Sequence, residues 1–169
     1  MQHGHMELVV GQAVVPISNA AMVSGSGIPS TALLCDNGAT INCAKTLAGA
    51  IPGTFMADES SEPISVGDSS ASLETRGSYL YAQKWTAANG QTVNTLRRCS
   101  FTPDVVCNIA SEALEVYDHG AAFEFRQKDG RVMVMSDGTV MPLHMTPNGL
   151  GWINLEPITD PVVVRELLD

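Results

Sequence analysis

The sequence predicts a mainly β fold with one short helix. Segments of strand length, rich in β-branched, aromatic and other apolar residues, recur along the chain and are separated by turn-forming clusters. Asn89-Gly90 and Asp129-Gly130 lie between two such segments each and favour tight hairpins. The predicted strands are residues 7–10, 13–17, 31–35, 64–66, 78–85, 92–101, 122–126, 131–135 and 141–144.

The predicted helix runs from about Glu112 to Asp118. Ser111 precedes it and can accept a hydrogen bond from an N–H of the first turn. Apolar residues recur on one face of this segment, and Gly120 follows it as a residue that commonly ends helices. The tail, residues 156–169, carries two prolines and then an apolar run, which indicates either a linker with a short helix or an added edge strand.

Composition and charge narrow the class of protein. The chain has 169 residues, of which 44% are hydrophobic and 16% charged, as expected for a globular chain of one domain or one domain with a tail. Nine Lys and Arg against 18 Asp and Glu give a net charge of −9, which argues against direct nucleic-acid binding. No apolar stretch approaches the roughly 18 residues of a membrane span. Residues 1–6 resemble a tag remnant and lack the features of a signal peptide, so we expect a cytoplasmic protein.

The four cysteines and four histidines do not form a metal motif. Both cysteine pairs, Cys35 with Cys43 and Cys99 with Cys107, lack the C-x-x-C spacing of zinc sites, and the histidines are scattered. We therefore expect no metal and no cofactor, and four reduced, mostly buried thiols. Cys35 and Cys107 are candidates for redox sensitivity because we expect both to lie beside the candidate active-site strand, residues 31–35, which leads into the motif described next.

Residues 33–40 read Leu-Leu-Cys-Asp-Asn-Gly-Ala-Thr and carry the strongest functional signal. Two apolar residues lead into Asp36, and Gly38 permits a sharp turn after it. This arrangement is similar to the way aspartic proteases present their catalytic carboxylate, although Asp-Asn-Gly is also a common turn sequence. Residues 118–121 read Asp-His-Gly-Ala and nearly repeat the motif, which would allow two aspartates in one chain. This segment follows a helix and not an apolar strand, and Gly120 is explained as the helix end. If Asp36 is catalytic, the second aspartate must come from another subunit of a homodimer.

The order of blocks after Asp36 resembles the proteases of copia-type retrotransposons, a branch of the retropepsin-like aspartic proteases. Asn37 stands where that family has Ser or Thr. The amide of Asn37 has both a donor and an acceptor, as the hydroxyl does, but it is bulkier. The resemblance extends over roughly residues 31–155 and is carried by residues 33–40, 64–70, 73–77, 96–105, 107–111, 120–125, 129–130 and 148–155.

The resemblance implies a retropepsin-like closed β-barrel or sandwich that acts as a homodimer. It divides the chain into an N-terminal extension with possible interface strands (1–30), a protease core (31–120) and a C-terminal β segment and tail leading towards the next polyprotein domain (121–169). It makes Asp36 the catalytic residue and places Ile109 and Ala110 beneath its loop. On the same resemblance, Asn37, Gly38, Ala39 and Thr40 are expected to support this loop. The resemblance also implies a flap that binds substrate, formed by Val66, Gly67, Asp68, Ser69 and Ser70.

The implied activity is that of an aspartic endopeptidase that processes its own polyprotein, in the cytoplasm or within virus-like particles. The expected partners are a second copy of the chain and an extended polypeptide substrate, without nucleic acid or membrane. One alternative is a catalytically weak or inactive module of the same fold that dimerises or binds peptides. A further alternative is an ordinary β-barrel or sandwich in which Asp36 and Asn37 belong to a plain turn.

Overall fold

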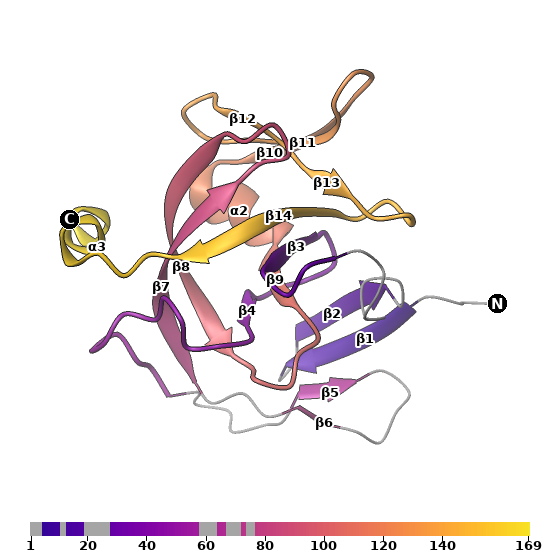
Figure 1. Ribbon diagram of the computed structural model, residues 1–169. Helices are drawn as coiled ribbons and strands as arrows, with labels where there is room; N and C mark the ends of the chain where they lie inside the picture. The colour runs from indigo at the N-terminus through magenta and orange to yellow at the C-terminus, as the bar shows by residue number, and fades with distance from the viewer. Residues whose placement is uncertain (1–4, 11–12, 19–27, 58–63, 67–71, 74–76) are drawn as a thin grey trace.

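The computed structural model describes residues 5–10, 13–18, 28–57, 64–66, 72–73 and 77–169. Within these residues the chain is mainly β, as predicted, and contains a closed barrel of six strands (Figure 1). The barrel order is β14-β3-β9-β4-β8-β7, and β7 pairs with β14 to close it. The barrel strands are β3 (Ala32–Asp36), β4 (Cys43–Ala44), β7 (Ser78–Thr86), β8 (Thr92–Phe101), β9 (Asn108–Ser111) and β14 (Gly151–Pro157).

Both predicted hairpins form. Strands β7 and β8 pair in register from Ser78 opposite Ser100 to Thr86 opposite Thr92, around the Asn89-Gly90 turn. Gly90 adopts a φ of 85°, which a residue with a Cβ rarely does. Asp129-Gly130 joins β10 (Ala122–Arg126) to β11 (Gly130–Val134).

A three-stranded sheet adds to the barrel. It has the order β10-β11-β12, and β12 spans Val140–Pro142. Met133 and Met141 from this sheet share one buried cluster with Leu33, Trp85 and Ile153 of the barrel. The small sheet and the barrel therefore enclose a common core. A short strand at the edge of the barrel sheet, β13 (His144–Met145), pairs with β14.

Helix α2 (Glu112–His119) lies where the sequence predicts it. The Ser111 hydroxyl accepts a hydrogen bond from Leu114 N–H at 3.2 Å. At the other end Gly120 has a φ of 68° and donates its N–H to carbonyls of the last turn. The predicted cap and the predicted helix end are both confirmed.

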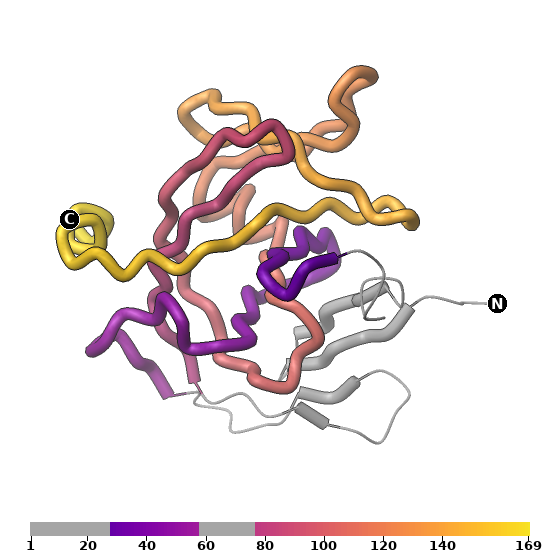
Figure 2. The backbone as a smooth tube through the Cα atoms, viewed as in Figure 1, coloured from indigo at the N-terminus to yellow at the C-terminus, as the bar shows by residue number. Residues whose placement is uncertain are grey.

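The prediction of one helix is wrong, because the described chain contains a second. Helix α3 spans Pro161–Leu168, which selects the helical alternative for the tail. Asp160 caps it by accepting a hydrogen bond from Val162 N–H at 2.9 Å, and proline is favoured at a first helical position. Figure 2 follows the chain from β14 into α3 at the C-terminus, where no residue of the helix is buried.

The remaining described strands form a separate sheet with the order β2-β1-β5-β6. These strands are β1 (His5–Val10), β2 (Ala13–Ser18), β5 (Ile64–Val66) and β6 (Ser72–Leu73). Strand β1 from the N-terminal extension pairs antiparallel with β5, Leu8 opposite Val66. Among the described residues, no helix has the length and apolar character needed to cross a membrane.

Candidate functional site

Asp36 is the last residue of β3, a strand in the middle of the barrel sheet. Strand β3 pairs antiparallel with β14 on one side and parallel with β9 on the other. All five residues of β3 are buried. Its three central side chains divide between two core clusters, Leu34 in one and Leu33 and Cys35 in the other. A strand buried on both faces holds the backbone of Asp36 in a fixed position, and the Asp36 residue itself is 1% exposed.

The turn after β3 holds the Asp36 carboxylate through the backbone. Gly38 N–H donates to Asp36 Oδ1 at 2.8 Å, and Ala39 N–H donates to the Asp36 carbonyl at 3.4 Å. This is the local geometry that Asp favours in turns. Ala39 is buried, whereas Asn37 and Thr40 are exposed. The structure thus places Asp36 at the end of β3 and the other four predicted residues in the loop that follows, with two of the four exposed to solvent.

Two polar residues that sequence reasoning did not assign to the site fix this loop. Ser111, opposite Asp36 in the β3–β9 register, donates its hydroxyl to the Ala39 carbonyl at 2.6 Å. Asn42 Oδ1 accepts the Ser111 N–H at 2.8 Å, and Asn42 Nδ2 donates to the Arg98 carbonyl at 3.1 Å. The sequence signal for Asn42 was a single polar residue between apolar neighbours. Ser111 was recognised only as a helix cap.

Two buried ion pairs anchor helix α2 beside the loop. Arg97 on β8 forms a two-pronged pair with Glu115, Nε to Oε1 at 2.7 Å and Nη2 to Oε2 at 3.0 Å. Arg131 on β11 pairs with Glu112. Both carboxylates are buried, so each needs its arginine to compensate lost hydration. Helix α2 is therefore held to the barrel and to the small sheet at once.

The electrostatic surroundings of Asp36 include a second carboxylate. Burial raises the pKa of Glu112, and the negative charge of Asp36 raises it further, while Arg131 lowers it. Glu112 therefore lies within electrostatic reach of Asp36. The contribution of Asp36 is smaller than those of burial and of Arg131.

The four cysteines are free and buried, as predicted. Burial, and secondarily the charges of Glu112 and Glu115, raises the pKa of Cys35 far above its ordinary value. Burial also raises the pKa of Cys107 to about 11. Thiols that stay protonated react slowly with oxidants, so these surroundings disfavour the redox sensitivity expected for Cys35 and Cys107.

The structure describes only part of the other predicted site segments. Val66 ends β5, whereas Gly67, Asp68, Ser69 and Ser70 of the expected flap lie outside the described residues. The expected packing beneath the loop is present: Ile109 pairs in register with Leu34 and is fully buried, and Ala110 pairs with Cys35.

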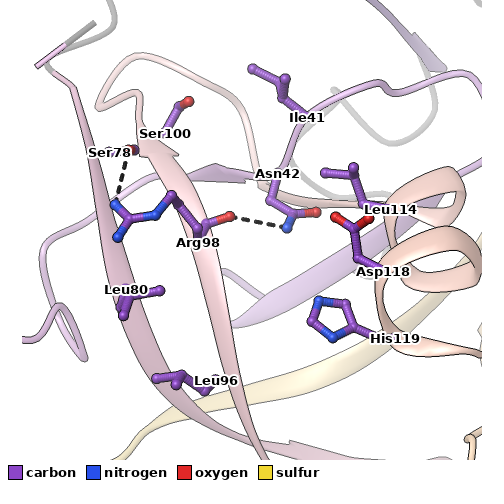
Figure 3. Close-up of a pocket in the computed structure, with 10 residues that line it drawn as sticks. All are labelled: Ile41, Asn42, Ser78, Leu80, Leu96, Arg98, Ser100, Leu114, Asp118 and His119. Atoms are coloured by element: carbon purple, nitrogen blue, oxygen red, sulfur yellow. Dashed lines mark hydrogen bonds between the residues drawn. The ribbon is translucent and has the colours of Figure 1, made fainter. Parts of the chain in front are cut away.

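A groove of about 580 Å³ lies between the β7–β8 hairpin and helix α2 (Figure 3). None of the residues from Asp36 to Thr40 lines it. Asn42 belongs to both places, because it lines the groove and bonds to the residue opposite Asp36. The lining residues are Ile41, Asn42, Ser78, Leu80, Leu96, Arg98, Ser100, Leu114, Asp118 and His119.

In the part of the chain that the structure describes, no three His, Cys, Asp or Glu residues are grouped so that they could hold a metal ion.

Neither a scan against protein-family models nor a search of the curated proteins finds a match to the chain. The function is therefore inferred from the residues and their geometry.

Proposed function

We propose that this chain is an aspartic endopeptidase of the copia retrotransposon type, with an active site shared by two copies. The observation that carries the proposal is the placement of Asp36. It ends a buried barrel strand, and the following loop holds one carboxylate oxygen through Gly38 N–H. The loop is in turn bound to Ser111 through Ala39. Such a constrained carboxylate is suited to chemistry that requires a fixed geometry.

The proposed chemistry uses one Asp36 from each copy. Two carboxylates about 3 Å apart hold one proton between them, because two like charges at that distance do not both ionise. The ionised carboxylate removes a proton from a water molecule, which attacks the peptide carbonyl. The protonated carboxylate stabilises the developing oxyanion, and a proton then passes to the leaving nitrogen. The pair titrates with two apparent pKa values that belong to the dyad.

Asn37 supports a contact between the two loops. Its side chain is exposed directly beside Asp36. Across a two-fold axis the same residue meets its own copy, and an amide offers one donor group and one acceptor to the other amide. Asn37 can therefore link the two loops in the place where related enzymes use a hydroxyl.

Burial of Asp36 sets a condition on this activity. In the single chain the residue is 1% exposed, so water and a peptide reach the carboxylate only if its surroundings open when the dimer or the substrate binds. The same burial favours a second candidate, a non-catalytic module of the same fold that dimerises or binds peptides. In that case Asp36 serves only to accept the Gly38 N–H and fix the turn.

Cleavage of a peptide library between pH 4 and 7 distinguishes the two functions. We expect cleavage by the wild type and none by Asp36→Asn, a variant in which the amide oxygen can still accept the Gly38 N–H. Asp104→Asn is the matched control, because it removes one exposed carboxylate from the loop before β9. Equal activity in wild type and Asp36→Asn would refute the catalytic role. A folded dimer without cleavage at any of these pH values would establish the non-catalytic module.

A further inference from the structure

We propose that the groove between the β7–β8 hairpin and helix α2 binds a peptide segment in which a carboxylate lies next to an aliphatic side chain. The proposed peptidase does not account for this groove, since residues 36–40 do not line it. Binding here therefore constitutes a second site on the chain, with its own recognition chemistry.

The size and the apolar lining of the groove suit a short peptide. Its volume of about 580 Å³ falls in the range of about 300–1,000 Å³ that is typical of ligand pockets. Four aliphatic side chains line it, and each is only partly buried by the chain itself. They come from three different parts of the fold, so a ligand side chain would contact both walls. These residues are Ile41, Leu80, Leu96 and Leu114.

Arg98 provides the group that would recognise a carboxylate. Its Nη1 donates to the Thr54 carbonyl at 3.1 Å and to Ser78 Oγ at 3.2 Å, which fixes one side of the guanidinium group. Within the described residues, Nη2 and Nε of Arg98 make no hydrogen bond. This edge has two parallel donors, the arrangement that binds a carboxylate through both oxygens.

Arg98 differs from three other arginines of the described chain, although Arg165 of helix α3 likewise has no ion pair there. Arg97, Arg126 and Arg131 each pair with a glutamate of this chain. Arg98 has no carboxylate partner among the described residues, although the chain carries a net charge of −9. The charge of this groove wall is therefore complementary to an acidic ligand group.

The opposite wall supplies groups that match a peptide backbone. Figure 3 shows Asp118 and His119 reaching the groove from α2, across from Arg98 and Ser78. Asp118 can accept a peptide N–H. Burial and the charge of Arg97 lower the pKa of His119, so the imidazole is neutral near pH 7 and can both donate and accept. Such mixed groups favour a peptide over a plain fatty acid, which has no N–H to offer.

A chemical-shift titration by NMR tests the proposal with acetyl-Leu-Leu as its free carboxylate. The matched amide, acetyl-Leu-Leu-NH₂, removes only the negative charge. We expect the carboxylate to shift resonances of groove residues and to bind at least about tenfold more tightly than the amide, as charge-assisted bonds to arginine allow. Arg98→Gln should abolish this preference, and Arg98→Lys should retain part of it. Arg126→Gln, an exposed arginine on β10, should bind as the wild type does.

Three results would overturn the recognition of a carboxylate in this groove. They are equal affinity for the carboxylate and the amide, an unchanged preference in Arg98→Gln, and shifts confined to residues outside the groove. Octanoate that binds as tightly as acetyl-Leu-Leu would overturn the assignment to a peptide. The titration should give the same affinity in the Asp36→Asn background, so this result is independent of whether the protein cleaves peptides.

Discussion

Asp36 accepts a hydrogen bond from Gly38 in its own turn. The same turn is bound through the Ala39 carbonyl to Ser111, the N-cap residue of helix α2. The motif predicted the first of these connections, because Asp followed two residues later by Gly is a local pattern. It did not predict the second, because Ala39 and Ser111 are 72 residues apart and meet only after β3 and β9 have paired. A hydrogen bond between residues so far apart in the sequence leaves no mark in a local window.

Replacing Asn42 with Ala should destabilise the fold. The substitution leaves the buried Ser111 N–H without its acceptor and the Arg98 carbonyl without its donor. A buried group left without a partner costs about 1–3 kcal/mol of unfolding free energy. Urea denaturation measures this loss, with Asn94→Ala as the control at an exposed position of β8. Equal unfolding free energies for the two variants would contradict the role given to Asn42.

Glu112 should make the stability of the protein depend on pH. Burial and Asp36 hold its folded pKa above the ordinary value of 4.5, so the folded state binds more protons than the unfolded state in this window. The unfolding free energy should therefore fall as the pH rises above about 4.5 and through the folded pKa.

Denaturation at a series of pH values tests this expectation. Glu112→Gln cannot ionise and should show a shallower fall than the wild type over the same window. The exposed Glu124→Gln variant controls for the loss of one charge. A wild-type curve that rises through this window relative to Glu112→Gln would show that the Arg131 pair outweighs burial.

Among the elements, the hairpins and helix α2 were predictable because their signals are local. Asn89-Gly90, Asp129-Gly130, the Ser111 cap and the Gly120 end each act within a few residues. Helix α3 was left open because its signals conflict. Asp160 and Pro161 favour a helix start, whereas three consecutive valines favour a strand.

Two glycines with the same backbone conformation allow a test of packing at the start of β7. Gly77 and Gly90 both have a φ of 85°. A Cβ at Gly77 would lie 2.6 Å from the Met56 carbonyl and against the Phe55 ring, whereas a Cβ at Gly90 meets nothing within 4 Å.

Both Gly→Ala variants should lose about 1–2 kcal/mol from the left-handed backbone conformation. Gly77→Ala should lose roughly 1–3 kcal/mol more, because the new methyl group forces its neighbours to move. Thermal unfolding of the two variants gives the comparison. Equal losses would mean that residues 55–56 move aside without cost, contrary to the packing described.

For the whole molecule, the strand pattern predicted the mainly β class, whereas a closed barrel was expected only through the resemblance. Residues 151–157 form β14, which joins β3 to β7 and closes the barrel. The strand pattern alone did not mark this segment, and only the resemblance indicated a β segment over residues 148–155. Which strands become neighbours depends on contacts across most of the chain, and strand propensity contains no such information.

The account of function depends on two copies that share one site, and mixing of subunits tests this most directly. Wild type at a fixed concentration is equilibrated with increasing Asp36→Asn, under conditions where sedimentation shows that subunits exchange, and peptide cleavage is measured. If each site needs an Asp36 from both copies, mixed dimers are inactive. Activity should then fall to about half with an equal amount of variant and to about a tenth with a ninefold excess. Activity that stays constant as the variant is added would contradict a shared aspartate dyad.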